Sequence, residues 1–307
     1  MSPTQIEYQD FGYSLTWSPD DRLLSVTTNT GLYVYDTGTR KQMAAFTVPG
    51  GSSVAFADKY MAAINGSSVH VWDLKDYSLL FQEAATDPIR FQSVSISPDG
   101  EWLVTGEQKQ FRIWKLPDGN VIAKFPIDGF VSNLAFTNNN TLIVIEQYKA
   151  VVQEWDLQDR NMIRSFEIPR DVLFFTLSAD GKTMLVDYGE SGVELWNVET
   201  GEPVHDYVQM QGASGWTRLS GNRRFATVWG YAIDGYHSGM GVWDLVEDKR
   251  IHEFSTSFVN GDGWRCGVLN SDGTVLAASN NEGYIYFYDL KSGKKIGEIF
   301  LPYRFTT

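Results

Sequence analysis

Short apolar runs recur along the whole chain, and most units share the same order of runs and turns. Residues 91–96 place an apolar side chain at every second or third position, and Ser97–Gly100 has the composition of a tight turn. Trp102–Thr105, Phe111–Trp114 and Val121–Phe125 are further short apolar runs separated by polar turns. Runs of four to six residues bounded by Gly, Pro, Asn and Asp are typical of strands in hairpins. The pattern predicts an all-β chain with four antiparallel strands per unit.

One aromatic residue, followed by a small polar or charged residue, marks the third strand of each unit. The marks are Tyr35-Asp36, Trp72-Asp73, Trp114-Lys115, Trp155-Asp156, Trp196-Asn197, Trp243-Asp244 and Tyr288-Asp289. Successive aromatics are 37, 42, 41, 41, 47 and 45 residues apart, which is the length of one four-stranded propeller blade. The sequence therefore predicts a single seven-bladed β-propeller over residues 1–307. Its blades are expected at about 11–48, 49–84, 85–126, 127–168, 169–208, 209–256 and 257–301.

Three of these marks carry a longer motif in which an apolar run ends in Trp-Asp-Leu. It is seen at Val69–Leu74, Glu154–Leu157 and Val242–Leu245. On these repeats the chain resembles the WD-repeat (Trp-Asp) β-propeller family over residues 11–300, which implies a platform for protein partners. No Gly-His dipeptide precedes an innermost strand, and most turns before the third strands lack the family's aspartate. The resemblance therefore does not imply the family's Ser/Thr-His-Asp-Trp hydrogen-bond network.

The charge balance and the single cysteine narrow the function classes. The formal net charge is −13, which argues against nucleic acid because such binding depends on Lys and Arg that neutralise phosphates. Cys266 has no second cysteine for an intrachain disulfide. The chain has no apolar stretch that predicts a signal peptide or a membrane span. We expect a cytoplasmic protein that binds neither a membrane nor nucleic acid.

No arrangement of residues predicts catalysis, a metal or a cofactor. The four histidines lack a neighbouring nucleophile and a metal-ligand spacing; they are His70, His205, His237 and His252. Asn260–Gly263 resembles a calcium loop but lacks its glutamate, so an ordinary glycine turn is expected. Quinoprotein propellers place a tryptophan after a glycine turn, whereas here the tryptophans precede it. The sequence thus predicts a non-enzyme, with one alternative: a small-molecule or hydrolytic propeller whose central channel uses Arg218 and Arg265 to bind anions.

A candidate partner surface lies where the sixth unit departs from the repeat. Residues 229–241 form a longer segment between the second and third strands than in the other units, and insertions in repeat proteins map to loops that often bind. Long connections also precede the innermost strands of the sixth and seventh units. The predicted contact residues are Trp216, Arg218, Trp229, Tyr231, Tyr236, His237, Phe258, Asp262, Trp264 and Arg265. The structural alternative is that Trp229 extends a strand, Tyr231 and Tyr236 pack a long hairpin, and Trp216 and Trp264 belong to the core.

Two further expectations concern how the ring is held together. The repeated tryptophans at 72, 114, 155, 196 and 243 occupy one position in the repeat, so they are expected to pack between blades. Lys294–Leu301 alternates after a turn, whereas Gln5–Gln9 is a weaker strand candidate. We therefore expect the last blade to take all four strands from the carboxy-terminal repeat, with the amino-terminal segment at most adding to an edge.

Overall fold

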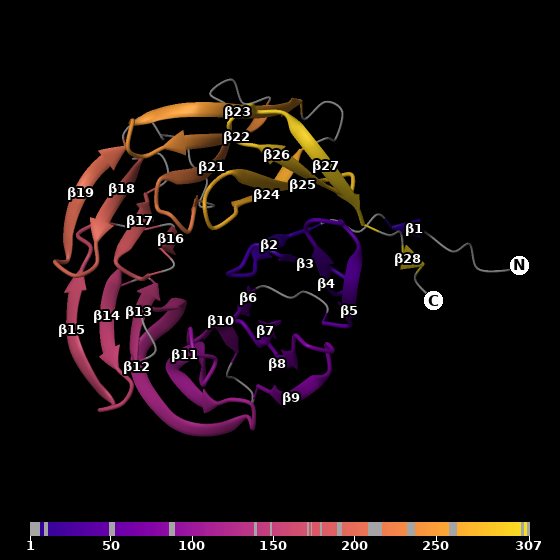
Figure 1. Ribbon diagram of the computed structural model, residues 1–307. Coiled ribbons are helices and arrows are strands. Elements are labelled where there is room, and N and C mark those ends of the chain that lie inside the picture. The colour runs from indigo at the N-terminus through magenta and orange to yellow at the C-terminus, as the bar shows by residue number, and fades with distance from the viewer. Residues whose placement is uncertain are drawn as a thin grey trace, which may run out of the picture.

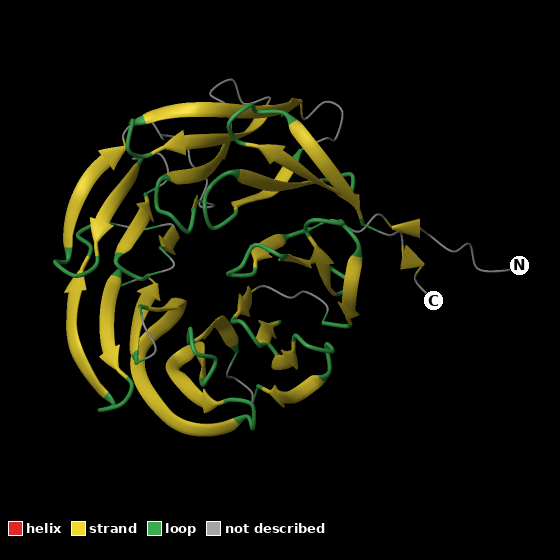
Figure 2. Cartoon of the chain, in the orientation of Figure 1, coloured by secondary structure: helices red, strands yellow, loops and turns green. Residues whose placement is uncertain are grey.

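The computed structural model contains strands and no helix in its described part. It describes residues 7–8, 12–48, 53–85, 90–137, 140–147, 149–170, 172, 174–178, 180–188, 192–207, 217–231, 237–257, 263–301 and 304–305. Figure 2 shows strands and connecting loops throughout these ranges. These residues contain no helix that is long and apolar enough to cross a membrane.

Consecutive strands pair antiparallel in chain order. One four-stranded sheet contains β2 (Ser14–Trp17), β3 (Leu23–Thr27), β4 (Leu32–Asp36) and β5 (Gln42–Phe46). The next contains β6 (Ser53–Phe56), β7 (Tyr60–Ile64), β8 (Ser68–Asp73) and β9 (Leu79–Ala84). A six-stranded sheet follows, with β10 (Phe91–Ile96), β11 (Trp102–Lys115), β12 (Asn120–Phe136), β13 (Thr141–Gln147), β14 (Val151–Asp156) and β15 (Asn161–Glu167).

Three more four-stranded sheets complete the order. They contain β16 (Phe174–Leu177), β17 (Thr183–Asp187), β18 (Val193–Asn197) and β19 (Glu202–Tyr207); β20 (Arg218–Leu219), β21 (Phe225–Tyr231), β22 (His237–Asp244) and β23 (Lys249–Ser257); and β24 (Trp264–Leu269), β25 (Val275–Asn280), β26 (Tyr284–Asp289) and β27 (Lys295–Phe300). A two-stranded sheet pairs β1 (Glu7–Tyr8) with β28 (Arg304–Phe305).

The four-stranded sheets and the six-stranded sheet stand around a common centre as a ring, with the first strand of each innermost (Figure 1). This is an all-β propeller, as the repeat predicts. The six-stranded sheet spans two predicted units, 85–126 and 127–168, because β11 and β12 continue where separate strands are expected. Gln108 at the predicted turn of β11 pairs with Phe130 of β12, so the turn itself belongs to the sheet.

The turns between the first and second strands follow a serine pattern. Ser18 Oγ lies 2.6 Å from Asp20 Oδ1 and accepts from the Leu23 amide at 2.9 Å. The same pair of contacts recurs at Ser97, Ser178 and Ser220. Short polar side chains that bind nearby backbone groups favour such turns. The predicted turn chemistry is therefore confirmed at these positions.

The polar residue after the marked aromatic closes the next turn. Asp36 Oδ1 accepts from the Thr39 amide and hydroxyl, both at 2.7 Å. Asp289 Oδ1 likewise accepts from the Ser292 amide at 2.8 Å. These turns end in a left-handed backbone, with φ of 59° at Arg40 and 66° at Gly293. The Asp of the Trp-Asp pair is thus a turn-forming residue.

Aromatic pairs fill the spaces between neighbouring sheets. A phenylalanine on the outer strand of one sheet contacts the marked aromatic of the next; the centroid distances are 4.4 Å for Phe46 with Trp72, 6.1 Å for Phe81 with Trp114, 6.2 Å for Phe166 with Trp196 and 4.6 Å for Phe254 with Tyr288. Such pairs add stability beyond the area they bury. The expected core role of the repeated tryptophans is confirmed.

The ring closes through the carboxy-terminal repeat. β27 pairs with β26 from Tyr284↔Phe300 to Tyr288↔Lys295, so the last sheet takes its four strands from one repeat, as predicted. The amino-terminal segment contributes β1, which pairs with β28 beside the ring rather than with the last sheet (Figure 1). The first and last sheets then meet through buried apolar side chains, among them Tyr33, Phe287 and Leu301.

Candidate interaction surface and central cavity

The ring has two ends with different connections. The loop face, as we call it, carries the connections into the innermost strands and the turns between second and third strands. The turn face, at the opposite end, carries the turns between first and second and between third and fourth strands. Antiparallel pairing in chain order sets this arrangement, so a residue's position in the repeat tells which face it occupies.

The β20–β23 sheet is elongated toward the loop face. β21, β22 and β23 have seven, eight and nine residues, whereas the corresponding strands of the other four-stranded sheets have five or six. The two added pairs are Gly230↔Gly239 and Tyr231↔Ser238, beyond the five pairs that join the corresponding strands of the other four-stranded sheets. The expectation that Trp229 extends the second strand is confirmed, and the predicted insertion is a longer hairpin.

The predicted contact residues fall into three groups. Trp216, Tyr236, Phe258 and Asp262 lie outside the described residues, as does most of the predicted glycine turn at 260–263. Trp229, Tyr231 and His237 belong to the elongated hairpin. Arg218, Trp264 and Arg265 lie on the innermost strands β20 and β24. The structure thus separates a hairpin at the loop face from residues near the centre.

Trp264 and Arg265 are neighbours with different surroundings. The Trp264 ring is only 6% exposed and meets Phe254, Tyr286 and Tyr288 edge-on, with centroids 5.9 to 6.5 Å away. It therefore packs in the core, the alternative left open by the sequence. Arg265 is exposed, donates to Asn281 Oδ1, and lies 6.0 Å from the Tyr13 ring centre.

Arg218 lies close to the centre of the ring. Its Nη1 donates to the Thr217 carbonyl at 3.0 Å, and the guanidinium carbon stands 4.6 Å from the Phe174 ring centre on β16. Such stacking on an aromatic face is typical of arginine. Burial lowers the pKa of the guanidinium, which nevertheless stays charged at neutral pH. A positive charge is therefore held deep in the propeller.

A cavity of about 420 Å³ lies beside Arg218. Its wall contains residues of β2, β6, β10, β20 and β24, and turn residues including Pro19, Gly221 and Ser271 form its end at the turn face. Leu15, Val54, Phe56, Val94, Ile96 and Val268 make most of this wall apolar. The sequence could predict a central channel but not this cavity, because its wall comes from strands more than 200 residues apart.

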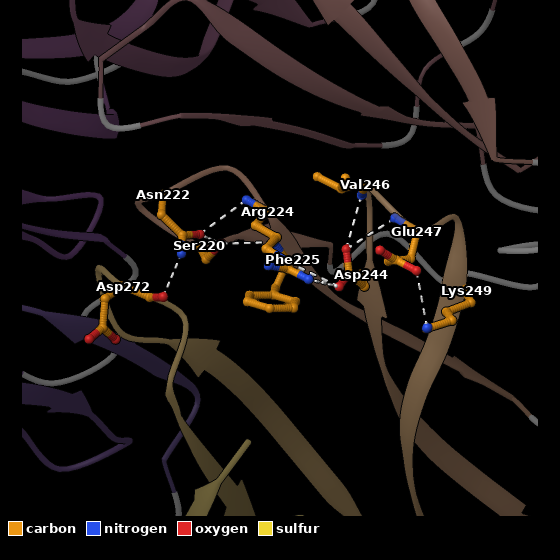
Figure 3. Close-up of polar contacts among 9 residues, drawn as sticks. All are labelled: Ser220, Asn222, Arg224, Phe225, Asp244, Val246, Glu247, Lys249 and Asp272. Atoms are coloured by element: carbon orange, nitrogen blue, oxygen red, sulfur yellow. Dashed lines mark hydrogen bonds and ion pairs between the residues drawn. The ribbon is translucent and has the colours of Figure 1, made fainter. Parts of the chain in front are cut away.

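Ion pairs at the turn face hold the β20–β23 sheet (Figure 3). Arg224 donates from Nε and Nη2 to Asp244 Oδ2 at 3.1 and 2.8 Å, while Asp244 Oδ1 accepts from the Val246 and Glu247 amides. Burial raises the pKa of Asp244, but these hydrogen bonds outweigh it and leave the pKa lowered. Pattern alone does not reveal this structural use of Arg224, because its partner is 20 residues away in the chain.

In three repeats the marked tryptophan donates to partners other than those of the family's network. Each indole Nε1 donates a hydrogen bond with a length of 2.9 Å. The acceptors are Thr105 Oγ1 for Trp114, Gln153 Oε1 for Trp155 and Glu194 Oε2 for Trp196. Pairing is expected for buried polar groups. The buried carboxylate of Glu194 is therefore used in structural contacts.

Glu194 also accepts from Tyr188 Oη at 2.7 Å. Burial, and secondly this carboxylate, raise the pKa of Tyr188. Burial lowers the pKa of His70, whose ring stacks on Trp72 at 5.5 Å. Across the ranges that the structure describes, no group of three or more His, Cys, Asp or Glu side chains is placed to hold a metal ion.

Comparisons with known proteins agree with the repeat architecture. The family described as "WD domain, G-beta repeat" matches residues 81–115. Periodic tryptophan protein 2 of Saccharomyces cerevisiae is 25% identical over 123 residues, covering 39% of this chain and 13% of that protein. Angio-associated migratory cell protein of Homo sapiens is 23% identical over 229 residues, covering 68% and 47%. Apoptotic protease-activating factor 1 of Rattus norvegicus is 22% identical over 212 residues, covering 65% and 15%.

Sheet order, repeated Trp-Asp turns and aromatic packing define a β-propeller built from sequence repeats. The matched repeat and the distant relatives agree with this architecture: the chain resembles the WD40-repeat β-propeller family. The chain spans less than half the length of these relatives. Proteins of this family commonly serve as interaction scaffolds.

Proposed function

We propose that this protein is a non-catalytic scaffold or adaptor that binds a protein partner in the cytoplasm, through the loop face of its last two repeats. We propose that it binds neither nucleic acid nor a membrane. The elongated hairpin of β21 and β22 is the observation that carries it. It adds backbone at the loop face, where repeat proteins often bind.

The residues of this hairpin suit a protein partner. Trp229 and Tyr231 belong to the types enriched in interface hot spots, and small residues such as Gly230 and Gly239 alternate with them. β23 is the outer strand of the sheet, and its extra residues Ser255–Ser257 present an edge on which a partner strand could pair. The hairpin thus combines residue types that are common at interfaces with a backbone edge.

We also propose that the six-stranded sheet acts as two blades, which makes seven blades in one domain over residues 1–307. Trp114 Nε1 reaches Thr105 Oγ1 at 2.9 Å although both belong to β11. Nine residues of straight strand span about 30 Å, so β11 must fold back on itself. Lys109, between the two, has a φ of 66°, which supports a tight turn there. β12 similarly pairs with β11 through Phe125 and with β13 through Phe136.

Shortening the hairpin tests the scaffold proposal. Replacing residues 231–238 with Asn-Gly leaves a two-residue turn between the paired Gly230 and Gly239, a connection that hairpins favour. We expect a nearly unchanged melting temperature and loss of the partner in affinity capture from a lysate of the source organism. Val246→Lys is the matched control, because Val246 is 74% exposed at the turn face of the same sheet.

Capture by the Val246→Lys variant should equal that of the parent protein. If the shortened protein is folded and still captures the same partner, the hairpin is not the contact surface. If only Val246→Lys loses the partner, the contact lies on the turn face.

A further inference from the structure

The outer strands, which follow the marked aromatics, share one irregularity in register. Each contains one extra residue opposite its marked aromatic, which is a β-bulge. In β23 the bulge lies between the pairs Val242↔His252 and Trp243↔Arg250, and the others lie in β5, β9, β12, β15, β19 and β27. Bulges twist the edge of a sheet away from other strands and so protect it from pairing. All these outer strands are therefore protected near the turn face.

The outer strand β23 has the longest regular run beyond its bulge. Six pairs follow there without interruption, from Val242↔His252 to His237↔Ser257. The corresponding runs of the other outer strands contain three or four pairs. Short edge strands resist pairing with other chains, and β23 lacks this protection. Among the described strands β23 pairs only with β22, so its second edge is the outer edge of the sheet.

The regular run of β23 also carries little charge toward the loop face. Glu253 is the one Asp, Glu, Lys or Arg in this run, and it forms an ion pair of 3.0 Å with Arg250. The four residues that follow, 254–257, are Phe-Ser-Thr-Ser. Five other outer strands carry charge within their regular runs, at Glu83, Lys124, Arg164 and Glu167, Asp206, and Glu298. Since charged residues on an edge oppose pairing, this end of β23 lacks a further protection.

Backbone groups at this end point to the open edge. In β27 the Leu301 amide donates to the Gly283 carbonyl at 2.8 Å. Hydrogen bonds to the neighbouring strand then alternate along the chain, and they include Gly297, the first residue after the bulge. β9 and β15 have the same alternation. Counted from its own bulge, β23 directs the N–H and C=O groups of Ser255 and Ser257 away from β22.

We propose that residues 254–257 of β23 bind an extended segment of the protein partner as an additional strand. This inference rests on the proposed scaffold function and names the contact that its partner makes. The segment is uncharged and β-branched where it pairs, because such residues favour strands. Basic residues flank it, because a net charge of −13 attracts cationic partners.

Two synthetic peptides test strand addition by fluorescence anisotropy. The labelled peptide Lys-Thr-Val-Thr-Val-Thr-Lys is compared with Lys-Thr-Pro-Thr-Pro-Thr-Lys, in which proline removes two amide donors. We expect the parent protein to bind the valine peptide about tenfold more tightly, or better, because backbone hydrogen bonds are lost with proline.

A matched pair of variants places this binding on β23. Ser255→Pro removes one N–H group from the open edge and leaves the pairing with β22, so it should abolish the preference for the valine peptide. Ser165→Pro makes the same change at an exposed residue of β15 whose N–H also points to an open edge, and it should keep the preference. Retained preference in a folded Ser255→Pro variant would overturn the proposal.

Amide hydrogen exchange keeps the test decisive if Ser255→Pro does not fold. In the parent protein the valine peptide should slow exchange at Ser255 and Ser257 and leave exchange at Ser165 and Glu167 unchanged. Equal binding of the two peptides, no binding at millimolar concentration, or unchanged exchange at Ser255 and Ser257 would each overturn the proposal. So would a parent protein that sediments as a dimer and becomes a monomer as Ser255→Pro, because the edge would then bind a second copy.

Failure of strand addition is distinguishable from failure of the scaffold function. If the protein with the shortened hairpin loses its partner from the lysate and the parent does not bind the valine peptide, strand addition is wrong and the scaffold function stands. Retained capture by the shortened protein contradicts the scaffold function, and with it this inference, even if the peptide binds.

Discussion

The junction between the third and fourth repeats and the junction between the first and last repeats hold the ring in different ways. At the former, β12 continues from one repeat into the next, and Phe130 pairs with both Gln108 and Gln147. At the latter, the described strands of β2–β5 and β24–β27 form separate sheets. Backbone pairing therefore crosses one junction, while side chains hold the other.

Polar contacts add to the buried apolar side chains at the first-to-last junction. Trp17 Nε1 donates to the Val268 carbonyl at 3.3 Å, and Ser279 Oγ donates to the Gly12 carbonyl at 2.9 Å. Asp21 adds its contacts with Ser271 at the turn face. The difference teaches that, where no strand crosses between the first and last repeats, side-chain contacts hold the ring closed.

The largest expected effect follows from removing β27. Ending the chain at Leu290 deletes the buried Ile299 and Leu301 and exposes β26 as an edge strand, and open edges promote aggregation. We expect unstable, aggregating protein on size-exclusion chromatography. Deleting residues 1–10 removes only β1 from the described strands and should leave a monodisperse protein with a similar melting temperature.

The reverse result, with a stable carboxy-terminal truncation and an aggregating amino-terminal one, would contradict closure by the last repeat.

The next effect is expected at the third-to-fourth junction. Trp155 meets Phe111 and Phe125 with ring centroids 5.2 and 5.1 Å away, so Trp155→Ala should lower the free energy of unfolding by about 3 kcal/mol. Urea unfolding measures this loss. A change below about 1 kcal/mol would show that the Trp155 side chain does not stabilise this junction.

Asp21→Asn tests the first-to-last junction with a smaller change. The variant keeps the shape of the side chain but weakens charge-assisted contacts to Ser271 and Asn270, so a loss of about 1 kcal/mol is expected. Asp58→Asn is the control, because Asp58 is an exposed residue in the corresponding turn of another repeat. Equal free energies of unfolding for the two variants would show that Asp21 does not stabilise ring closure.

The smallest effect near neutral pH concerns the acidic turns of the first and last repeats. The Thr39 amide and hydroxyl hold the pKa of Asp36 below 3.8, and the Ser292 hydroxyl and amide do the same for Asp289. Because the folded-state pKa is depressed, this stabilisation is complete above the unfolded value and disappears as pH falls through the folded one.

The melting temperature should therefore stay nearly constant from about pH 7 to 5 and fall below about pH 4. Asp36→Asn combined with Asp289→Asn should reduce this acid dependence. A melting temperature that rises below pH 4 would contradict the role of these turns.

Much of the fold is readable from the sequence because its determinants are local. The Ser-x-Asp turn at Ser18 and the turn capped by Asp36 involve residues two to five positions apart. The aromatic marks repeat because each blade presents one such residue to its neighbour, as Trp72 does to Phe46. The candidate hairpin was also readable, since an insertion changes the repeat length.

The sequence by itself determined the all-β repeat, its turns, the packing role of the repeated tryptophans and the four strands of the last repeat. The tertiary structure alone decided that Trp264 is buried while Arg265 is exposed, that Asp21 meets Ser271, and that Arg218 lies beside a central cavity. The physical reason is how far apart the interacting residues lie in the chain. Strand period and turn chemistry depend on neighbours in the chain, whereas ring closure and the cavity join residues about 200 to 250 positions apart, which meet only when the whole ring has formed.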